Sequence, residues 1–273
     1  MTEADGAVLH GRWVRLRRWY LRGTRLLLAV LSPGADKQCP FCGWRFREFL
    51  PGGMDAAALK GARYIGGGRR RNVYCPRCES SDRERHLYLC LTHRTNVFTA
   101  SLSLLHVAPA RSLQRMLMRR HDIRYLTADL NSPKVMVRMD ITRIACSDAS
   151  FDAILCSHVL EHVQNDKQAL AELYRVLKPG GWAVLQAPIA PSLARTYEDA
   201  SNITAEGRLA TFGHSSHVRI YGADYSARIE KAGFSVELFN YAAAFGKEAA
   251  SRYALIEDEQ VYLCWKRVEG DAG

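Results

Sequence analysis

Short apolar runs alternate with amphipathic stretches along the chain from Leu102 onward, and this alternation constrains the fold more than any other feature. Buried strands are predicted at residues 104–107, 123–127, 135–139, 151–156, 182–187, 234–239 and 260–265. Helices are predicted at residues 82–92, 111–120, 166–177 and 225–232. Strands that alternate with helices pair in parallel and cross over with a right-handed sense. The sequence therefore predicts an α/β fold built around a mostly parallel sheet.

The size of the chain limits how many domains it can hold. A chain of 273 residues suits one α/β domain of ordinary size and a small appendage. Its composition, with 48% hydrophobic and 24% charged residues, is that of a globular protein. We predict a basic N-terminal segment at 1–38, a cysteine module with a connecting helix at 39–86, and the α/β domain at 87–273.

Positive charge is concentrated in the first third of the chain. Residues 1–86 hold 17 Lys and Arg against 8 Asp and Glu, which accounts for nearly all of the formal net charge of +10. Such asymmetry predicts an anionic partner, and nucleic acid, a phosphorylated substrate and a membrane surface are the alternatives. A solubilising arm with no partner would carry the same charge.

Residues 11–31 are predicted to form a basic amphipathic helix. One face carries Arg12, Arg15, Arg18, Arg22 and Arg25, and another carries Trp13, Leu16, Tyr20 and Leu27. Such a helix suits peripheral contact with a membrane, and the alternative is a surface helix packed on the α/β domain. The apolar run at 26–31 is too short for a signal peptide or a spanning helix. We therefore expect a cytoplasmic protein, with peripheral membrane contact as the alternative.

Four of the eight cysteines form two Cys-x-x-Cys pairs, Cys39 with Cys42 and Cys75 with Cys78. Each pair can direct two thiolates at one metal from a tight turn, and two such turns complete a tetrahedral site. The spacing predicts bound zinc, with iron as the competing metal. A four-cysteine site has no open coordination position, so this zinc is predicted to be structural.

Aromatic and basic residues follow the first cysteine pair, among them Trp44, Arg45 and Phe46. They could bind nucleic acid by base stacking and phosphate contacts. The alternative, which we favour, is that they form the small core of the module and its solvated rim.

The α/β region contains a long ordered set of motifs between Val135 and Pro188. It reads Ser-Phe-Asp-Ala-Ile at 150–154, His-Val-Leu-Glu-His-Val at 158–163, and Ala-Leu-Ala-Glu-Leu-Tyr-Arg-Val-Leu-Lys-Pro-Gly-Gly at 169–181. Over roughly residues 102–240 the chain resembles the class I (Rossmann-like) S-adenosylmethionine-dependent methyltransferases of the ubiquinone/menaquinone-methyltransferase-like group. The resemblance implies a seven-stranded sheet with one antiparallel edge, and S-adenosylmethionine as the cofactor.

The same resemblance implies which residues follow the first strand at the cofactor. That family has an acidic residue and then a glycine-rich loop at this place. Here His106 stands in the place of the acid, while Ala108 and Ala110 stand in the places of glycines. A small residue can replace glycine here if the backbone stays in ordinary φ/ψ regions.

The remaining cofactor positions follow the later strands. Asp129, with Leu130 beside it, is expected to accept hydrogen bonds from the ribose hydroxyls. Asp140 and Ile141 match the position that contacts adenine. Cys156 ends the fourth strand, at the carboxyl edge where ligands bind in open α/β sheets.

Methyl transfer to a hydroxyl group needs a base, and histidine is the usual base near neutral pH. The candidates are His158 and His162 after the fourth strand, and His214 and His217 in the insertion before the last helix. We predict His217 as the first choice, then His162, then His158. Histidines and acidic residues can also bind a metal ion, but no spacing here demands one.

The function predicted from these features is O-methylation of a sugar or another hydroxylated acceptor, either a small molecule or a glycoconjugate. The first alternative is an RNA methyltransferase whose basic cysteine module binds RNA. The second is a non-catalytic zinc-containing binding protein built on a methyltransferase fold, for which the altered first loop is the only support.

Overall fold

The computed structural model describes residues 36–53 and 64–268, so the predicted helix at 11–31 lies outside the described residues. The strands are β1 (Lys37–Gln38), β2 (Arg45–Phe46), β3 (Leu50–Gly52), β4 (Arg70–Tyr74), β5 (Ser103–Val107), β6 (Arg124–Asp129), β7 (Val137–Arg138), β8 (Phe151–Ser157), β9 (Leu177–Gln186), β10 (Tyr197–Glu198), β11 (Arg219–Ile220), β12 (Ser235–Phe239) and β13 (Val261–Trp265). The helices are α2 (Asp82–Arg94), α3 (Arg111–Leu117), the 3₁₀ helix η2 (Leu160–His162), α4 (Asp166–Val176), α5 (Ala205–Phe212), α6 (Tyr225–Glu230), α7 (Tyr241–Phe245) and α8 (Lys247–Arg252).

A seven-stranded sheet forms the centre of the molecule, in the order β12-β13-β9-β8-β5-β6-β7. All of its strands run parallel except β13, which pairs antiparallel with both β12 and β9. The predicted α/β fold is therefore confirmed. The antiparallel strand β13 is the second strand of the sheet, however, because β12 pairs with its outer side and forms the edge. Since the chain adds β6 and β7 on one side of β5 and then returns to place β8 on the other, the strand order reverses between β5 and β8.

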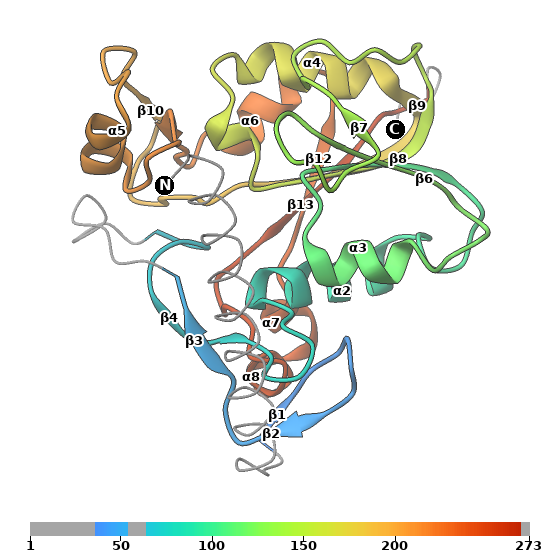
Figure 1. The fold of residues 1–273 in the computed structure, drawn as a ribbon, viewed down its shortest axis with the longest axis vertical. Helices are drawn as coiled ribbons and strands as arrows, with labels where there is room; N and C mark the ends of the chain where they lie inside the picture. Colours follow the sequence, from blue (N-terminus) through green and yellow to red (C-terminus); the bar gives the residue numbers. More distant parts are fainter. Residues whose placement is uncertain (1–35, 54–63, 269–273) are drawn as a thin grey trace, which may run out of the picture.

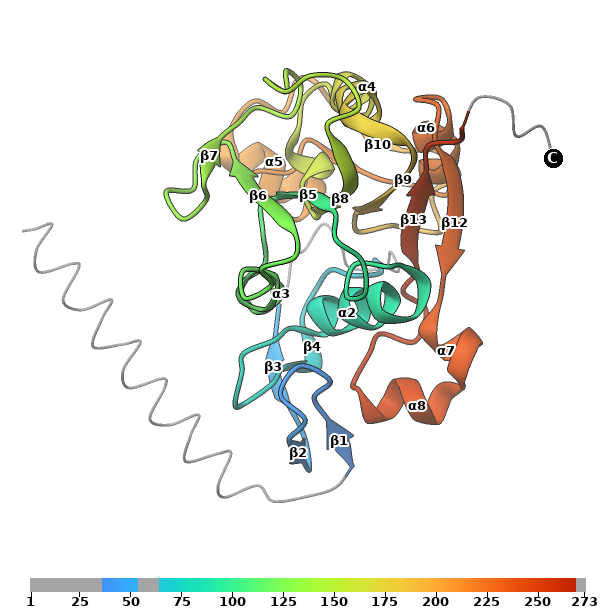
Figure 2. The ribbon, with the colours of Figure 1, turned by 90° about the vertical axis from the view of Figure 1, so that its right-hand side faces the viewer.

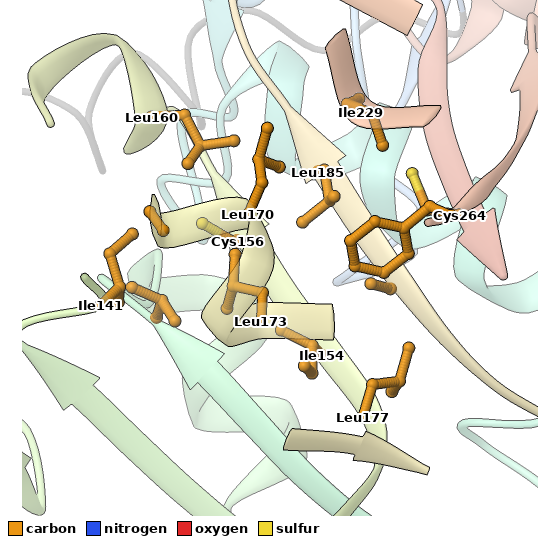
Figure 3. Close-up of a cluster of buried hydrophobic side chains, with 14 of the residues drawn as sticks. Ile141, Ile154, Cys156, Leu160, Leu170, Leu173, Leu177, Leu185, Ile229 and Cys264 are labelled. Atoms are coloured by element: carbon orange, nitrogen blue, oxygen red, sulfur yellow. The ribbon is translucent and has the colours of Figure 1, made fainter. Parts of the chain in front are cut away.

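Helices cover both faces of this sheet (Figure 1). On one face, α4 and α6 contribute Leu170, Leu173 and Ile229 to a buried cluster, part of which is drawn in Figure 3. On the other face, α2 and α3 contribute Leu91 and Leu113, among others, to a second cluster. This three-layer arrangement explains why the central strands read as nearly continuous apolar runs, since both of their faces are buried.

The cysteine module, defined here as residues 36–53 and 64–80, lies beyond α2 on the side away from α4 (Figure 2). Two short antiparallel pairs build it, β1 with β2 and β3 with β4. Phe46 and Phe49 are buried beside the cysteines, so the predicted small core is confirmed for these two residues. Trp44 is half exposed, and the guanidinium of Arg77 lies 4.1 Å from its ring centre.

One prediction for the module is wrong. The run Gly-Gly-Gly-Arg-Arg-Arg at 66–71 predicts, from its composition, a flexible charged loop and no structural element, yet Arg70 and Arg71 belong to β4. The physical reason is an ion pair that the sequence spacing does not reveal. The guanidinium of Arg70 donates two hydrogen bonds to the carboxylate of Asp82, which is 2% exposed, at 2.8 and 3.1 Å.

Helix α2 connects the module to the sheet and crosses the predicted boundary at residues 86 and 87. It begins at a capping box, in which Ser81 and Glu84 satisfy each other's backbone N–H groups. Its later residues, including Leu87 and Leu91, pack in the core beneath the sheet. Among the described helices, none combines the length and apolar character needed to cross a bilayer.

Candidate functional site

The four cysteines of the two Cys-x-x-Cys pairs come together in space. The Sγ atoms of Cys39 and Cys78 are 3.4 Å apart, and those of Cys42 and Cys75 are 3.8 Å apart. Four thiolates around one zinc ion, with Zn–S bonds of about 2.3 Å, would lie about 3.8 Å from one another. None of these cysteines forms a disulfide. The cluster therefore has the size and chemistry of a closed four-thiolate metal site.

Arg85 ties this cluster to the α/β domain. It is 0% exposed, and its guanidinium donates only to backbone carbonyls, at distances of 2.8 to 2.9 Å. Its acceptors are Asn72, Val73 and Ser80 of the module and Tyr253 and Ala254 of the α/β domain. The positive charge of Arg85 also interacts with three of the cysteines. A buried guanidinium of this kind is stabilised by the negative charge that metal-bound thiolates carry.

The predicted cofactor edge lies at the reversal of strand order between β5 and β8. Two residues with positive φ follow these strands directly, Ala108 with φ 44° and His158 with φ 57°. The condition for replacing glycine is therefore not met at Ala108: this alanine adopts the conformation that a glycine would take without strain. Ala110, by contrast, has φ −70° and caps α3. Strained residues of this kind concentrate at binding sites, and here they mark the crevice of the sheet.

Most of the predicted cofactor residues line up along this same edge. Asp129 ends β6, with the exposed Leu130 next to it. One carboxylate oxygen of Asp129, Oδ1, accepts hydrogen bonds at 2.7 Å from the backbone N–H groups of Asn131 and Ser132. Asp140 and Ile141 follow β7, where Asp140 is exposed and Ile141 is buried. Since the turn engages Oδ1 of Asp129, its Oδ2 is the atom that could accept from a ribose.

Two other predicted cofactor residues lie inside the sheet. The ring of His106 is 2% exposed, and its Nδ1 is 2.8 Å from the hydroxyl of Tyr125. Burial lowers the pKa of His106 to about 3. Cys156 is 0% exposed, and Figure 3 shows it close to Leu170 and Leu173 of α4. Both side chains are therefore part of the packing around the strands that carry the site.

We expect acid to destabilise the protein partly through His106. The unfolded histidine titrates near pH 6.5, whereas the folded one stays neutral down to about 3, so the unfolded state binds the extra proton between these values. As the pH falls from 7 to about 4.5, the free energy of unfolding should decrease by about 2–3 kcal/mol because of His106. Urea unfolding should show that His106→Asn, which does not titrate, is spared this loss. Equal acid losses in both proteins would contradict the prediction.

A cavity of about 530 Å³ opens where the cysteine module, the start of α2 and the segment after β8 meet. Its lining includes Tyr64 and Arg70 from the module, Arg83 and Glu84 from α2, and His158, Glu161, His162, His214 and His217 from the α/β domain. Three of these histidines are the predicted bases. Tyr64 and His217, which lie 153 positions apart in the sequence, therefore line the same cavity.

Polar groups inside this cavity lack partners among the described residues. Nδ1 of His158 is 3.4 Å from the carboxylate of Glu161, but neither ring nitrogen makes a hydrogen bond. Oε2 of Glu161, the hydroxyl of Tyr64 and Nε of Arg83 are likewise buried without one. An unpaired buried polar group costs about 1–3 kcal/mol, so a group of them in one cavity indicates a binding site.

The histidines at 162, 214 and 217 form a separate group in the cavity wall. The ring centre of His217 lies 4.7 Å from that of His162 and 4.6 Å from that of His214. His217 is 8% exposed, and burial lowers its pKa to about 4. Arg219 fixes this arrangement, because its guanidinium donates to the carbonyls of Leu160 and Gln164 around η2 at 2.8 and 2.9 Å.

Several residues of the site were not predicted from the sequence. Glu84 is one: besides capping α2, its carboxylate accepts from the backbone N–H of Ser112 at 2.7 Å and so holds the loop after β5. The motif Ser-Asp-Arg-Glu at 81–84 indicates the helix start, but nothing local indicates this second contact. Arg83, Glu161 and Arg219 were also missed. Glu161 and Arg219 lie one and two residues from the predicted bases His162 and His217, but the roles of all three depend on long-range packing.

Solved structures of low sequence identity are similar to part of this chain. A methyltransferase dependent on S-adenosylmethionine from Mesorhizobium loti is 15% identical, covers 67% of this chain and 97% of its own, and has a TM-score of 0.45. The 1,6-didemethyltoxoflavin-N1-methyltransferase of Burkholderia thailandensis is 14% identical, covers 66% of this chain and 76% of its own, and has a TM-score of 0.44.

Curated proteins match shorter stretches. The chain is 43% identical over 70 residues to the "Uncharacterized 37.1 kDa protein in transposon TN4556" of Streptomyces fradiae, a match that covers 25% of this chain. It is 48% identical over 46 residues to a demethylmenaquinone methyltransferase of Streptomyces avermitilis, covering 17% of this chain. Each match spans 20% of the relative's own length.

A family model described as "Methyltransferase domain" matches residues 99–185. This range runs from the residues before β5 through most of β9, so it contains the reversal of strand order and the edge where Ala108 and His158 lie. The match agrees with the motifs at 150–181 and with the sheet topology. The stretch at 99–185 is therefore similar to a methyltransferase domain, in agreement with the resemblance carried by the sequence motifs.

Proposed function

We propose that the chain transfers a methyl group from S-adenosylmethionine to a hydroxyl group of a sugar or another hydroxylated acceptor. The observation that carries this proposal is the cavity of about 530 Å³, in which buried hydrogen-bonding groups without partners surround His158. A cavity of this size suits a small molecule or the end of a glycan, within the usual range of ligand pockets. Unpaired polar groups favour an acceptor that brings hydroxyls to them.

We place the cofactor along the edge of the sheet next to this cavity. Oδ2 of Asp129 would accept from the ribose, and Asp140 and Ile141 would lie against the adenine, while the loop from Ala108 to Ala110 would pass under the methionine moiety. The cofactor supplies a methyl group on a positively charged sulfur. The protein's own contribution is to place the acceptor oxygen in line with that group and to remove its proton.

We propose His158 as the base, ahead of His217, which the sequence analysis ranked first. It follows β8 directly, at the crevice, and Glu161 lies 3.4 Å from its Nδ1. A carboxylate in that position orients the ring and stabilises the imidazolium that forms when Nε2 takes the proton. His217 and His162, in contrast, lie ring against ring with each other, which leaves them less free to meet an acceptor.

The four-cysteine cluster is proposed to hold zinc in a structural role. Its thiolates would fill all four coordination positions, so the ion would do no chemistry on the acceptor. It would instead hold β3 and β4 in place, and Arg70 and Tyr74 of β4 line the cavity. On this view the module forms one wall of the acceptor site.

Replacing Asp129 with alanine should weaken binding of S-adenosylmethionine. Losing hydrogen bonds between a charged acceptor and the ribose costs about 1.5–3 kcal/mol, or roughly 10- to 150-fold in affinity. Isothermal titration calorimetry measures this directly. Because Oδ1 also caps the following turn, Asp129→Asn serves as the control: it keeps a side-chain oxygen for the turn but lacks the charge. Affinity equal to that of the parent in Asp129→Ala would refute the assignment.

An acceptor screen tests the proposed reaction itself. The full chain, incubated with S-adenosylmethionine labelled in its methyl group, should transfer label to hydroxylated acceptors such as sugars and glycoconjugates. The label should resist mild base, as an ether does. Transfer to RNA, with weakening at high salt, would support the RNA methyltransferase alternative instead. Failure to bind the cofactor at all would support a non-catalytic binding protein.

A further inference from the structure

Three histidines from two separate segments meet in the cavity wall. His162 ends η2, whereas His214 and His217 follow α5. One ring nitrogen of each lies within 4.8 Å of the corresponding nitrogen of the other two. We propose that this histidine triad binds a divalent first-row transition metal, such as zinc, and that the site is distinct from the four-cysteine cluster.

The separation of the nitrogens suits a metal after a small adjustment. Three histidine nitrogens around a tetrahedral zinc, with bonds of about 2.0–2.1 Å, lie about 3.4 Å from one another. A separation of up to 4.8 Å therefore calls for movements of about 1 Å in the rings. His162 is exposed and His214 is half-buried, so both rings have room to move, while the buried His217 provides the fixed ligand.

The buried member of the triad indicates that something is bound there. His217 is 8% exposed, and its Nδ1 makes no hydrogen bond with any of the described residues. A buried ring nitrogen without a partner costs free energy, and a metal ion would satisfy it. Imidazole suits zinc, iron, copper and nickel, so the ligand type and the unpaired nitrogen point to the same class of ion.

Contacts around the triad hold its two segments in register. The backbone N–H of Val218 donates to the carbonyl of Glu161 at 2.9 Å, which joins the residue after His217 to the residue before His162. The hydroxyl of Ser216 is 2.9 Å from Nδ1 of both His162 and His214. Metal-binding histidines commonly have such a partner for the ring, because it fixes the orientation of the ligand.

The triad differs from the cysteine cluster in what its metal can do. Three protein ligands leave a coordination position for a water or a substrate, which is the arrangement of catalytic zinc sites. All three histidines line the cavity that also holds His158 and the buried carboxylate of Glu161. A dication held by three neutral ligands is favoured by a nearby carboxylate.

The site's role rests on the proposed function. The hydroxyl oxygen of the acceptor would take the open position, and the metal would lower its pKa so that the proton passes to His158. The oxygen would then form a bond to the methyl carbon while the carbon–sulfur bond breaks. The methylated acceptor and S-adenosylhomocysteine would leave, and the proton would later pass from His158 to water.

Metal stoichiometry tests the site without relying on methyl transfer. The full chain, prepared without a histidine tag, is dialysed against micromolar free zinc, and its zinc is measured by mass spectrometry. The parent should hold two equivalents, and His214→Ala and His162→Ala should each hold one. His121→Ala, which removes an exposed histidine outside the triad, is the matched control and should keep two. Thermal unfolding checks that each variant is folded.

Cobalt substitution separates the two sites. The parent should show a thiolate-to-cobalt charge-transfer band together with weaker bands of nitrogen-bound cobalt, and His214→Ala should lose only the weaker bands. A parent that binds one equivalent, or a His214→Ala variant that binds as much metal as the parent, would overturn the proposal. If two equivalents bind but no acceptor is methylated, the site stands and the proposed function fails. If label is transferred although only one equivalent of zinc is bound, the proposed function stands and the histidine metal site fails.

Discussion

Replacing Cys75 with serine is expected to remove one zinc equivalent per chain and to unfold the cysteine module. A structural zinc site contributes an apparent 10–16 kcal/mol to the folding of small zinc modules, which exceeds what their small cores can supply. Phe46 and Phe49 are the only large aromatic side chains buried beside the cysteines in the described part of the module. Without the metal, this core should not hold β1 to β4 together.

The effect should reach the α/β domain through Arg85. Its guanidinium spans the carbonyls of Ser80 in the module and of Tyr253 and Ala254 after α8. If the thiolate charge and the module carbonyls are lost, this buried cation loses most of its compensation. Hydrogen exchange should therefore speed up both in the module and at the C-terminal end of α8.

Zinc analysis combined with hydrogen exchange provides the measurement. Cys146→Ser, which changes a half-buried cysteine outside the cluster, is the matched control and should leave both readings at the parent values. A Cys75→Ser protein that keeps its zinc and its protected module would contradict the structural role. Loss of zinc with no change in exchange would mean that the small core is sufficient by itself.

The central sheet could be predicted because its signals are local. Strands such as β5 and β8 are short, largely apolar runs next to a turn or helix signal, and all of the predicted strands are present with ends shifted by a few residues. The largest shift is at β9, which begins at Leu177 instead of residue 182. Leu177 already pairs with Phe151, and Gly180 donates to the carbonyl of Lys266, so the Pro-Gly turn that ends α4 becomes part of the sheet.

The short helices could not be predicted in the same way. Helices α7 and α8 have five and six residues, too few to show a helical period. They are held by tertiary packing instead, as where Lys37 of β1 donates to the carbonyl and hydroxyl of Ser251 in α8 at 2.8 Å. That contact joins residues 214 positions apart, and no sequence window covers it.

The candidate site was predicted in part, for a related reason. Asp129 ends β6 and His158 follows β8, so the topology alone places both at one edge of the sheet. The cavity depends in addition on how the cysteine module docks, which is decided by Arg85 and by the ion pair of Arg70 with Asp82. In a sequence, arginines of this kind are indistinguishable from solvent-exposed charges. The prediction of a charged loop at 66–71 failed for this reason.

Replacing His158 with asparagine is expected to lower turnover by about 10²- to 10⁴-fold while binding of S-adenosylmethionine persists, because a positioned base contributes about this much. Burial lowers the pKa of His158, so its imidazole is neutral near pH 7 and can accept a proton. Asparagine is the informative replacement, since His158 has φ 57° and asparagine tolerates this left-handed conformation. The backbone after β8 should therefore stay in place while the basic nitrogen is lost.

Two further variants separate a base from a residue that only supports the fold. His158→Gly also tolerates the positive φ and leaves space, so added imidazole should restore part of its turnover if His158 is the base. Glu161→Gln keeps the shape of the side chain beside His158 but removes its charge. It should lower turnover less than the loss of His158 does, because the carboxylate acts only through the His158 ring. Turnover of His158→Asn within a few-fold of the parent would rule out His158, and the base would then be sought at His217 or His162. If His158, His162, His214 and His217 could each be replaced by alanine with turnover within a few-fold of the parent, the acceptor would be a nucleophile that needs no proton removal.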